Sequence, residues 1–329
     1  MSKSNKYYLA IDAGKGSLKY SLMDESGKIE YGKIDTNVRP FDEDEDDEDA
    51  LLKFSSGLNI AEYKNKKYVV GDINAETSEN NSKVADDTHT IISLVAIAKL
   101  IPNGSTISVI VGVPLGEYIN DKAKYISLIL PRGDVKIDVN KETHSFNIAN
   151  IDYLPECLGS VKASFADVID NNSQVGFIDW GYLNSTCCYY KTGQFQNNLK
   201  VFDKNGVGIV LHNICNVCNN ELNPVKRFTI ADIKLAMLNN MSLEGYEEES
   251  KEIFTKEFRK AFKSVIKACN GAGWDITRCQ LVFIGGGSQI MKETILENYP
   301  NAIIGDEYTN AKSFMKVLCK AYGLVCKEE

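Results

Sequence analysis

The sequence predicts an α/β protein with two similarly built domains, and three glycine-containing segments support this prediction. Residues 7–21 and 174–190 each read as an apolar strand, an aspartate, a glycine turn and a second strand. Residues 279–291 contain a short apolar strand that ends in three consecutive glycines. The repetition indicates two related halves that each contribute one loop to a shared cleft, and 329 residues suffice for two domains with separate cores.

The composition is that of an ordinary globular protein, with 43% hydrophobic and 25% charged residues. A formal net charge of −8 disfavours broad attraction to a nucleic-acid backbone. No secretory signal precedes the first strand, and no apolar run approaches the roughly 20 residues that span a bilayer. We therefore expect a soluble cytoplasmic protein without direct nucleic-acid or membrane contacts, whose nine cysteines are reduced thiols.

The first glycine turn has the residues of a phosphate site. Gly14 and Gly16 can adopt positive φ and lack a Cβ atom, so backbone N–H groups from Gly14 to Ser17 could converge on an anion. Asp12, which precedes the turn, would face a metal ion. A Walker A loop needs Ser or Thr directly after Gly-Lys, followed by a helix, whereas here Gly16 intervenes and a strand follows. A plain antiparallel hairpin explains the same residues, and the downstream segments favour the phosphate site.

The rest of the first half should alternate strands and helices around one acidic run. Residues 42–49 are eight consecutive acidic residues, which repel one another and are expected to form a solvated loop. The same run could instead be a docking site for a basic partner or a neighbouring subunit. The other elements expected in this half are strands at 28–34, 68–72 and 106–118, helices at 90–100, 122–130 and 161–169, and a hairpin at 135–148.

One carboxylate lies at the strand-to-helix entrance formed by residues 151–159. Glu156 could partner the N-terminus of the following helix or position a water molecule. The preceding strand ends in Val-Pro-Leu-Gly-Glu-Tyr at 113–118, where proline closes it.

In the second half, Asp179 and Gly181 repeat the pattern of the opening hairpin. Gly206 and Gly208 lie in a turn at 201–208, and the glycines at 285–287 would let the backbone lie flat against a planar ring or a phosphate. Helices are expected at 209–219, 228–238, 247–268 and 310–324, the second of them capped by Thr229 with a weak capping-box signal from Asp232. Cys215 and Cys218 have the spacing of half a zinc site, but no second pair is nearby, so we interpret them as buried helical thiols.

Taken in order along the chain, these motifs resemble the actin, Hsp70 and sugar-kinase superfamily, and within it the ParM-type bacterial actins that segregate plasmids. The resemblance implies an actin-like two-domain α/β fold with ribonuclease H-like halves around an interdomain nucleotide cleft. It implies a domain I at 1–160 and 311–329, with an inserted subregion at about 31–100, and a domain II at 161–310, which contains the adenosine-binding part.

The resemblance also implies functional residues. In this family the aspartates of the two hairpins approach the nucleotide's Mg²⁺ mostly through water, which implies that role for Asp12 and Asp179. Residues 154–157 resemble the family's Pro-Glu-Ser run, which implies that Glu156 positions the attacking water and that Glu156 and Asp179 are catalytic. The second loop departs from the family, because 179–185 reads Asp-Trp-Gly-Tyr-Leu-Asn-Ser instead of Asp-Leu-Gly-Gly-Thr-Thr. The implied nucleotide-binding residues are Asp12, Gly14, Lys15, Gly16, Ser17, Gly181, Gly206, Gly208, Gly285, Gly286 and Gly287.

The implied function is that of a filament-forming ATPase. ATP, or GTP, with Mg²⁺ would hold a closed conformation that assembles, and hydrolysis would weaken the polymer. The chain would bind itself end to end in a polar, multi-stranded filament, and a ParR-like DNA-binding adaptor at the filament end would carry plasmid DNA. Two alternatives stay open. A small-molecule kinase of this superfamily would need a substrate pocket and a carboxylate base such as Asp179, and an actin-like scaffold would assemble without turnover.

Overall fold

The computed structural model describes residues 5–54, 57–72, 87–118, 125 and 128–326 of the chain. The chain divides into two compact units, Met1–Phe165 with Tyr308–Glu329, and Ala166–Glu307. The first unit therefore contains both ends of the chain. The helix expected at 122–130 lies outside the described residues except at 125 and 128–130.

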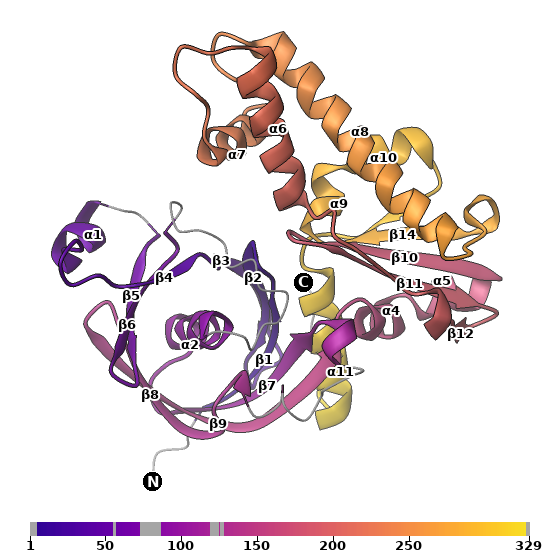
Figure 1. The fold of residues 1–329 in the computed structure, drawn as a ribbon. Coiled ribbons are helices and arrows are strands. Elements are labelled where there is room, and N and C mark those ends of the chain that lie inside the picture. Colours follow the sequence, from indigo (N-terminus) through magenta and orange to yellow (C-terminus); the bar gives the residue numbers. More distant parts are fainter. Residues whose placement is uncertain (1–4, 55–56, 73–86, 119–124, 126–127, 327–329) are drawn as a thin grey trace. The chain divides into compact units, whose positions relative to one another are not determined.

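A sheet of nine strands, in the order β3-β2-β1-β7-β9-β8-β5-β6-β4, forms the first unit (Figure 1). Its centre is parallel, because β7 runs parallel to both β1 and β9, whereas the outer pairs are antiparallel. The strands are β1 Lys6–Ala13, β2 Ser17–Met23, β3 Ile29–Asp35, β4 Val38–Pro40, β5 Asn59–Tyr63, β6 Lys66–Val70, β7 Ser105–Val113, β8 Gly133–Val139 and β9 Glu142–Pro155.

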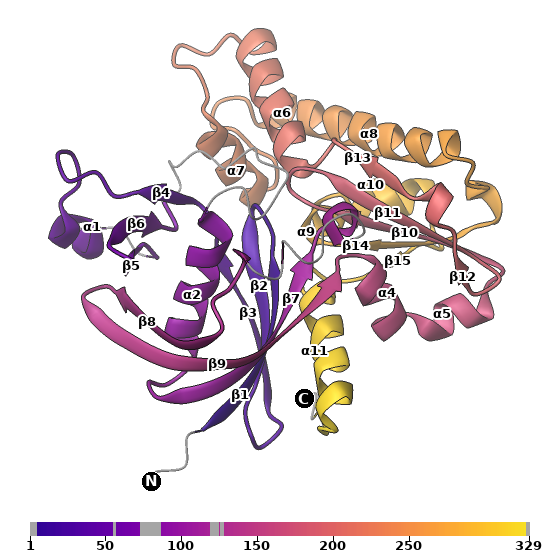
Figure 2. The ribbon, with the colours of Figure 1, turned by 60° about the horizontal axis from the view of Figure 1, so that its bottom comes forward.

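Helices cover both faces of this sheet. The sheet curls around α2 (Thr88–Leu100), which contacts β1, β4, β5, β8 and β9 (Figures 1 and 2). Residues 91–98 of α2 are all buried, as expected of a helix that is apolar all round. On the other face, α11 (Thr309–Tyr322) packs its Phe314 and Leu318 side chains against Ala10 of β1. The described part of this unit also contains two short helices, α1 (Glu48–Phe54) and α4 (Leu158–Ser164).

The second unit contains a smaller sheet in the order β12-β11-β10-β14-β15, with β13 paired to β11. Its main core lies between this sheet and the helices α6 and α8, where Trp180 stacks on Phe262 with ring centroids 6.3 Å apart. The strands are β10 Gln174–Trp180, β11 Ser185–Lys191, β12 Gln194–Phe195, β13 Val201–Asp203, β14 Gln280–Ile284 and β15 Ile303–Ile304. The helices are α5 Ala166–Asn171, η1 Asn197–Leu199, α6 Val207–Glu221, α7 Ile230–Leu238, α8 Glu247–Gly271, η2 Ile276–Arg278, α9 Gly286–Ile290 and α10 Lys292–Asn298.

Both units repeat one sheet plan. In the first, the antiparallel hairpin β1–β2 is followed by a parallel partner, β7. In the second, the hairpin β10–β11 is followed by a parallel partner, β14. The predicted α/β class and the two predicted hairpins are therefore confirmed.

Several predicted elements have different boundaries in the structure. The helix expected at 161–169 is two short helices, α4 and α5, which are separated by Phe165. Helix α6 begins at Val207, two residues earlier than expected, and α8 continues to Gly271. The capping box of α7 is present, because Thr229 and Asp232 exchange hydrogen bonds between their side chains and backbone amides.

The prediction that the acidic run at 42–49 is a solvated loop is wrong for part of the run. Residues 48–49 begin helix α1, where acidic side chains favour the helix dipole. The Asp46 carboxylate receives hydrogen bonds of 2.5 and 2.7 Å from the Arg39 guanidinium, and its side chain is only 10% exposed. Glu48 pairs with Lys67 at 2.5 Å. Arg39 on β4 and Lys67 on β6 thus offset the repulsion among the carboxylates, which was the reason for predicting a solvated loop.

The prediction of nine reduced thiols is wrong for two of them. Cys319 and Cys326 form a disulfide at the end of α11. Gly323 ends this helix in the left-handed conformation, with φ of 63°, and the amide of Leu324 donates to the Cys319 carbonyl at 2.9 Å. This turn brings the chain back along the helix, so that Cys326 reaches Cys319. The other seven cysteines are not disulfide-bonded, and Cys215 and Cys218 are buried on α6 as expected.

Candidate functional site

The first glycine turn joins β1 to β2, and a strand rather than a helix follows it, as predicted. Neither Gly14 nor Gly16 has a positive φ, so the left-handed backbone that glycine permits is not used in this turn. Gly14 is favoured instead by a close approach, because a Cβ atom there would lie 3.0 Å from the Ser17 carbonyl oxygen. The same Cβ would lie 3.6 Å from the ammonium of Lys19, which places a cation beside the turn.

A buried hydrogen-bond chain holds the carboxylate of Asp12. Asp12 is 9% exposed, and its Oδ2 accepts a 3.3 Å hydrogen bond from Asn310 Nδ2 on α11. Asn310 is also hydrogen bonded through Oδ1 to the Ser160 hydroxyl on α4. One turn further along both helices, the hydroxyls of Ser164 and Ser313 lie 2.7 Å apart. We call these four residues of α4 and α11 the polar seam.

Sequence reasoning missed the polar seam. Its members belong to helices that are about 150 residues apart in the chain. The available signal was weak: Asn310 and Ser313 are polar residues within one turn of the apolar Phe314, on the side of α11 that is buried. A polar residue on such a face needs a buried partner.

Glu156 follows β9 directly, and its position is fixed by the neighbouring strand. Its amide donates to the Val113 carbonyl at the end of β7, at 2.8 Å. A Cβ atom on Gly112 would lie 3.3 Å from Glu156 Cγ and 2.7 Å from the Phe314 ring. Because β1, β7 and β9 are parallel, the carboxyl ends of β1 and β9 lie at the same edge of the sheet. The first unit therefore presents Asp12 and Glu156 at one edge, where open α/β sheets bind ligands.

Two further polar groups accompany Glu156. The hydroxyl of Tyr125 and Oε2 of Glu117 are buried without a hydrogen-bond partner among the described residues. Burial raises the pKa of Tyr125 well above its usual value, and the negative charges of Glu156 and Glu117 add to this shift. The phenol therefore stays protonated and available as a donor near these two carboxylates.

In the second unit, Asp179 lies against the first of the three glycines. Asp179 is paired with Ile284 across the parallel strands β10 and β14. A Cβ atom on Gly285 would lie 2.5 Å from Asp179 Oδ1, and the φ of this glycine is +85°. A Cβ atom on Gly287 would lie 2.8 Å from the Trp180 carbonyl oxygen. Both glycines are therefore needed for the backbone to pass the end of β10.

The second glycine loop packs against the start of α6. The amides of Gly206, Val207 and Gly208 donate to the carbonyls of Leu183, Gly181 and Tyr182, at 3.2, 3.1 and 2.7 Å. The Tyr182 ring covers Gly208, where a Cβ atom would lie 2.6 Å from the ring. Trp180 Nε1 donates to the Asn205 carbonyl at 2.9 Å. The amides of Gly206 and Gly208 thus bind the loop at 179–185, whose sequence departs from the family pattern. Tyr182 occupies the position at which the family has its second glycine.

Each unit thus gathers its own set of predicted residues. Asp12, Glu156 and the turn at 14–17 come together in the first unit, and Asp179, Gly181, Gly206, Gly208 and the glycines at 285–287 in the second. No group of three or more metal-binding side chains occurs among the residues that the structure describes. Mg²⁺ usually binds through one or two carboxylates together with phosphate oxygens and water, and Asp12 and Asp179, one beside each turn, suit that mode.

The N-terminal part of the chain matches a known family. Residues 10–159 match the family described as actin like proteins, N terminal domain. No curated protein sequence is significantly similar to the chain. Of the helices in the described ranges, none has the length and apolar character needed to cross a membrane.

Solved structures of Alp12 and of ParM proteins resemble nearly the whole chain. The Alp12 filament structure is 22% identical, with a TM-score of 0.64 over 97% of this chain and 100% of that one. A 15-stranded ParM filament from Clostridium botulinum is 16% identical, with a TM-score of 0.72 over 95% and 99% of the two chains. Bacillus thuringiensis ParM with ATP is 14% identical, with a TM-score of 0.63 over 97% and 100%. The actin-like fold and the resemblance to ParM-type actins are therefore confirmed.

Proposed function

We propose that this chain, whose residues 10–159 match the actin-like proteins and whose fold is that of the bacterial actins, is a nucleotide-dependent, filament-forming ATPase. One observation carries the proposal. Each unit places an aspartate one residue before the end of a central strand, and a glycine directly after that strand, in Asp12–Gly14 and Asp179–Gly181. Two such loops on one repeated sheet plan suit a ligand that carries several phosphates.

Each loop then has a defined task. Asp12 and Asp179 would hold Mg²⁺ through water, and the ion would neutralise the phosphate charge that develops during transfer. The Gly14 amide donates to the Asp12 carbonyl at 3.0 Å, so amides of residues 15–17 would bind phosphate oxygens, with Lys19 adding a positive charge. Glu156 would accept a hydrogen bond from the attacking water and so orient it. The backbone of residues 285–287 would lie against the adenosine of ATP, or the guanosine of GTP.

Self-assembly is the second part of the proposal. Alp12 and the Clostridium botulinum ParM form filaments, and we infer end-to-end assembly of this chain into a polar, multi-stranded filament in the cytoplasm. Assembly with bound triphosphate and weakening after hydrolysis would let the filament move or position DNA. We place it in plasmid segregation, with a ParR-like adaptor that binds DNA at the filament end.

Sedimentation tests this proposal. Purified protein is centrifuged at high speed with ATP, GTP, ADP or no nucleotide, each with Mg²⁺. We expect the protein to sediment with a triphosphate and to stay in the supernatant without nucleotide, and we expect Asp12→Ala to lose this response. Protein that stays in the supernatant under every condition, over a wide range of concentrations, would contradict the filament function and direct attention to small-molecule phosphoryl acceptors.

A further inference from the structure

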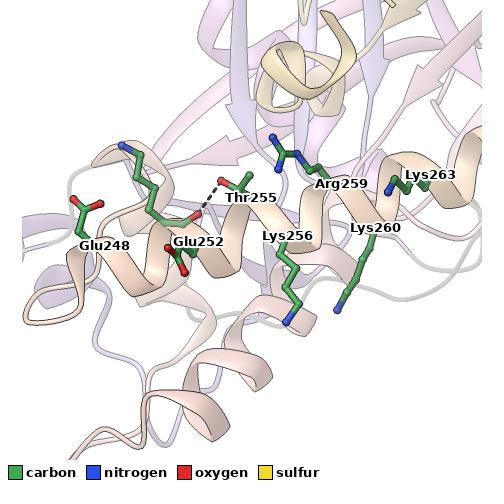
Figure 3. A pocket seen from close by; sticks show the side chains of 8 residues that line it. Glu248, Glu252, Thr255, Lys256, Arg259, Lys260 and Lys263 are labelled. Carbon is green, nitrogen blue, oxygen red and sulfur yellow. Dashed lines mark hydrogen bonds between the residues drawn. The ribbon is translucent and has the colours of Figure 1, made fainter. Parts of the chain in front are cut away.

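A basic groove runs along the exposed side of α8, and none of its lining residues belongs to the predicted nucleotide site. It has a volume of about 530 Å³ and is lined by one helix alone (Figure 3). Five of its eight lining residues are basic and two are acidic. The lining residues are Glu248, Lys251, Glu252, Thr255, Lys256, Arg259, Lys260 and Lys263. The opposite side of α8 is buried in the core of the second unit, so this side of the helix is the one that faces outward.

The positive charge of the basic groove is only partly neutralised within the unit. Three of the five basic residues are paired. Arg259 pairs with Glu297 at 3.0 Å, with both side chains about half exposed, Lys260 pairs with Glu257 at 2.5 Å, and Lys256 lies 3.9 Å from Glu221. Lys251 and Lys263 have no ion pair among the described residues. The chain as a whole has a net charge of −8, so this groove is a basic region on an otherwise acidic protein. It favours an acidic ligand.

The acidic run at 42–49 offers the matching charge on the other unit. Three of its eight carboxylates are paired within their own unit, namely Asp46 with Arg39, Glu48 with Lys67, and Asp49 with Lys141 at 2.6 Å. The other five have no ion pair among the described residues; they are Asp42, Glu43, Asp44, Glu45 and Asp47.

The three ion pairs also fix the backbone of the run. Additional hydrogen bonds run from the amide of Asp42 to Asp46 at 2.8 Å and from the amide of Asp44 to Asp42 at 3.0 Å. The run is therefore held in place on the rim of the first unit's sheet. A partner that binds a preorganised charged segment loses less conformational entropy than one that binds a flexible segment.

We propose that the basic groove on α8 binds the acidic run at 42–49 of a second copy of this chain. The inference rests on the proposed function, because it names a contact between subunits of the filament. The groove lies on one unit and the run on the other, so the contact joins two different surfaces and can repeat from copy to copy. Such heterologous contacts that do not close into a ring build open filaments. Charged contacts of this kind set the association rate and weaken with salt.

Cross-linking between copies tests the contact directly. ¹⁵N-labelled and unlabelled protein are mixed in equal amounts with ATP and Mg²⁺, and a carbodiimide then couples carboxylates to amines that touch. Mass spectrometry distinguishes peptide pairs within one copy from pairs that join two copies. We expect peptides containing residues 42–47 of one copy to be joined to Lys251 or Lys263 of another. Cross-links at these positions only within one copy would overturn the proposal.

Charge reversal tests the contribution of the groove to assembly. Lys251→Glu combined with Lys263→Glu should raise the protein concentration needed for sedimentation by about tenfold at low salt, and by less at high salt. The matched control reverses two exposed lysines of the same unit that lie outside the groove, Lys191 on β11 and Lys292 on α10. Both double variants should bind nucleotide like wild type. Equal sedimentation of the two double variants would overturn the proposal.

A rescue separates the contact from a change in folding. Glu43→Lys combined with Glu45→Lys should weaken sedimentation alone and restore it when mixed with the Lys251→Glu, Lys263→Glu variant. If wild type sediments under no condition, the proposed filament function fails. Cross-links between the groove of one copy and the acidic run of another would still support this contact in that case. A third outcome is that wild type binds duplex DNA, the Lys251→Glu, Lys263→Glu variant does not, and no cross-links form between copies. That outcome would assign the groove to nucleic acid and overturn the proposal.

Discussion

At the scale of single residues, Gly285 is the position where the third glycine segment meets a carboxylate. Gly285→Ala adds a Cβ atom 2.5 Å from Asp179 Oδ1 at a φ of +85°. The carboxylate must therefore move, and we expect nucleotide affinity to fall by about tenfold or more, as measured by titration with a fluorescent nucleotide. Gly193→Ala is the matched control, because its φ is +76° and nothing lies within 4 Å of its Cβ position.

Both glycine variants incur the cost of left-handed backbone, about 1–2 kcal/mol of unfolding free energy. Only Gly285→Ala displaces Asp179. If the two variants bound nucleotide equally well, Asp179 would not take part in nucleotide binding.

The pair Asp46 and Arg39 gives a pH dependence with a defined sign. Hydrogen bonding to the Arg39 guanidinium lowers the pKa of Asp46 below its ordinary value. The stabilisation is therefore present above the pKa of the unfolded chain, near 3.9, and is lost as pH falls through the lower pKa of the folded state. We expect Asp46→Asn to lower the free energy of unfolding by about 1 kcal/mol at pH 7 and by less at pH 3, where the unfolded chain is already mostly protonated at this position.

Urea unfolding at several pH values measures this difference. Asp49→Asn is the control, because Asp49 pairs with Lys141 at a position where its own side chain is 87% exposed, and solvent screens that pair. An Asp46→Asn effect that was the same at pH 3 and pH 7 would show that the charge of Asp46 is not what stabilises the run.

At the scale of elements, the polar seam connects α11 to the first glycine loop. Asn310→Ala removes the donor to Asp12 and leaves the buried Ser160 hydroxyl without this partner. We expect a loss of about 2 kcal/mol of unfolding free energy together with weaker nucleotide binding. Ser164→Ala removes a seam hydroxyl that bonds only Ser313 among the described side chains, so it should reduce stability and leave nucleotide affinity unchanged. Equal nucleotide affinity in the two variants would argue against a positioning role for Asn310.

Elements with a strong local pattern could be predicted from the sequence. The hairpin β1–β2 was predicted from its apolar strand, aspartate and glycine turn, and the Thr229 cap from its partner three residues further on. Both are present. The break between α4 and α5 was not predicted, because nothing in the sequence near Phe165 marks a helix end. The ion pairs of the acidic run could not be predicted, since Lys67 and Arg39 reach it only after β4 and β6 have paired.

The candidate site shows the same division. The positions of both glycine loops could be predicted, because an apolar strand followed by aspartate and glycine occurs twice in the sequence. The contact between Asp12 and Asn310 could not be predicted, because these residues are 298 positions apart and no local sequence pattern joins them. Tyr182 at a position where the family has glycine indicated a different loop, and only the structure shows that its ring lies over Gly208.

At the scale of the whole molecule, two units with one sheet plan each present a glycine loop and an aspartate. The resemblance to filament-forming actins covers nearly the whole chain, whereas the proposed reaction would depend on a few side chains, above all Glu156. If Glu156 orients the attacking water, its loss should slow hydrolysis and leave the triphosphate-bound state able to assemble.

The measurement that tests this account most directly is phosphate release and sedimentation in the same sample, for wild type and Glu156→Gln with ATP. We expect wild type to sediment and release phosphate, and Glu156→Gln to sediment at least as well while releasing phosphate at least tenfold more slowly. Wild type that released phosphate without sedimenting, or a Glu156→Gln variant that released phosphate at the wild-type rate, would contradict the proposed coupling of assembly to hydrolysis at this residue.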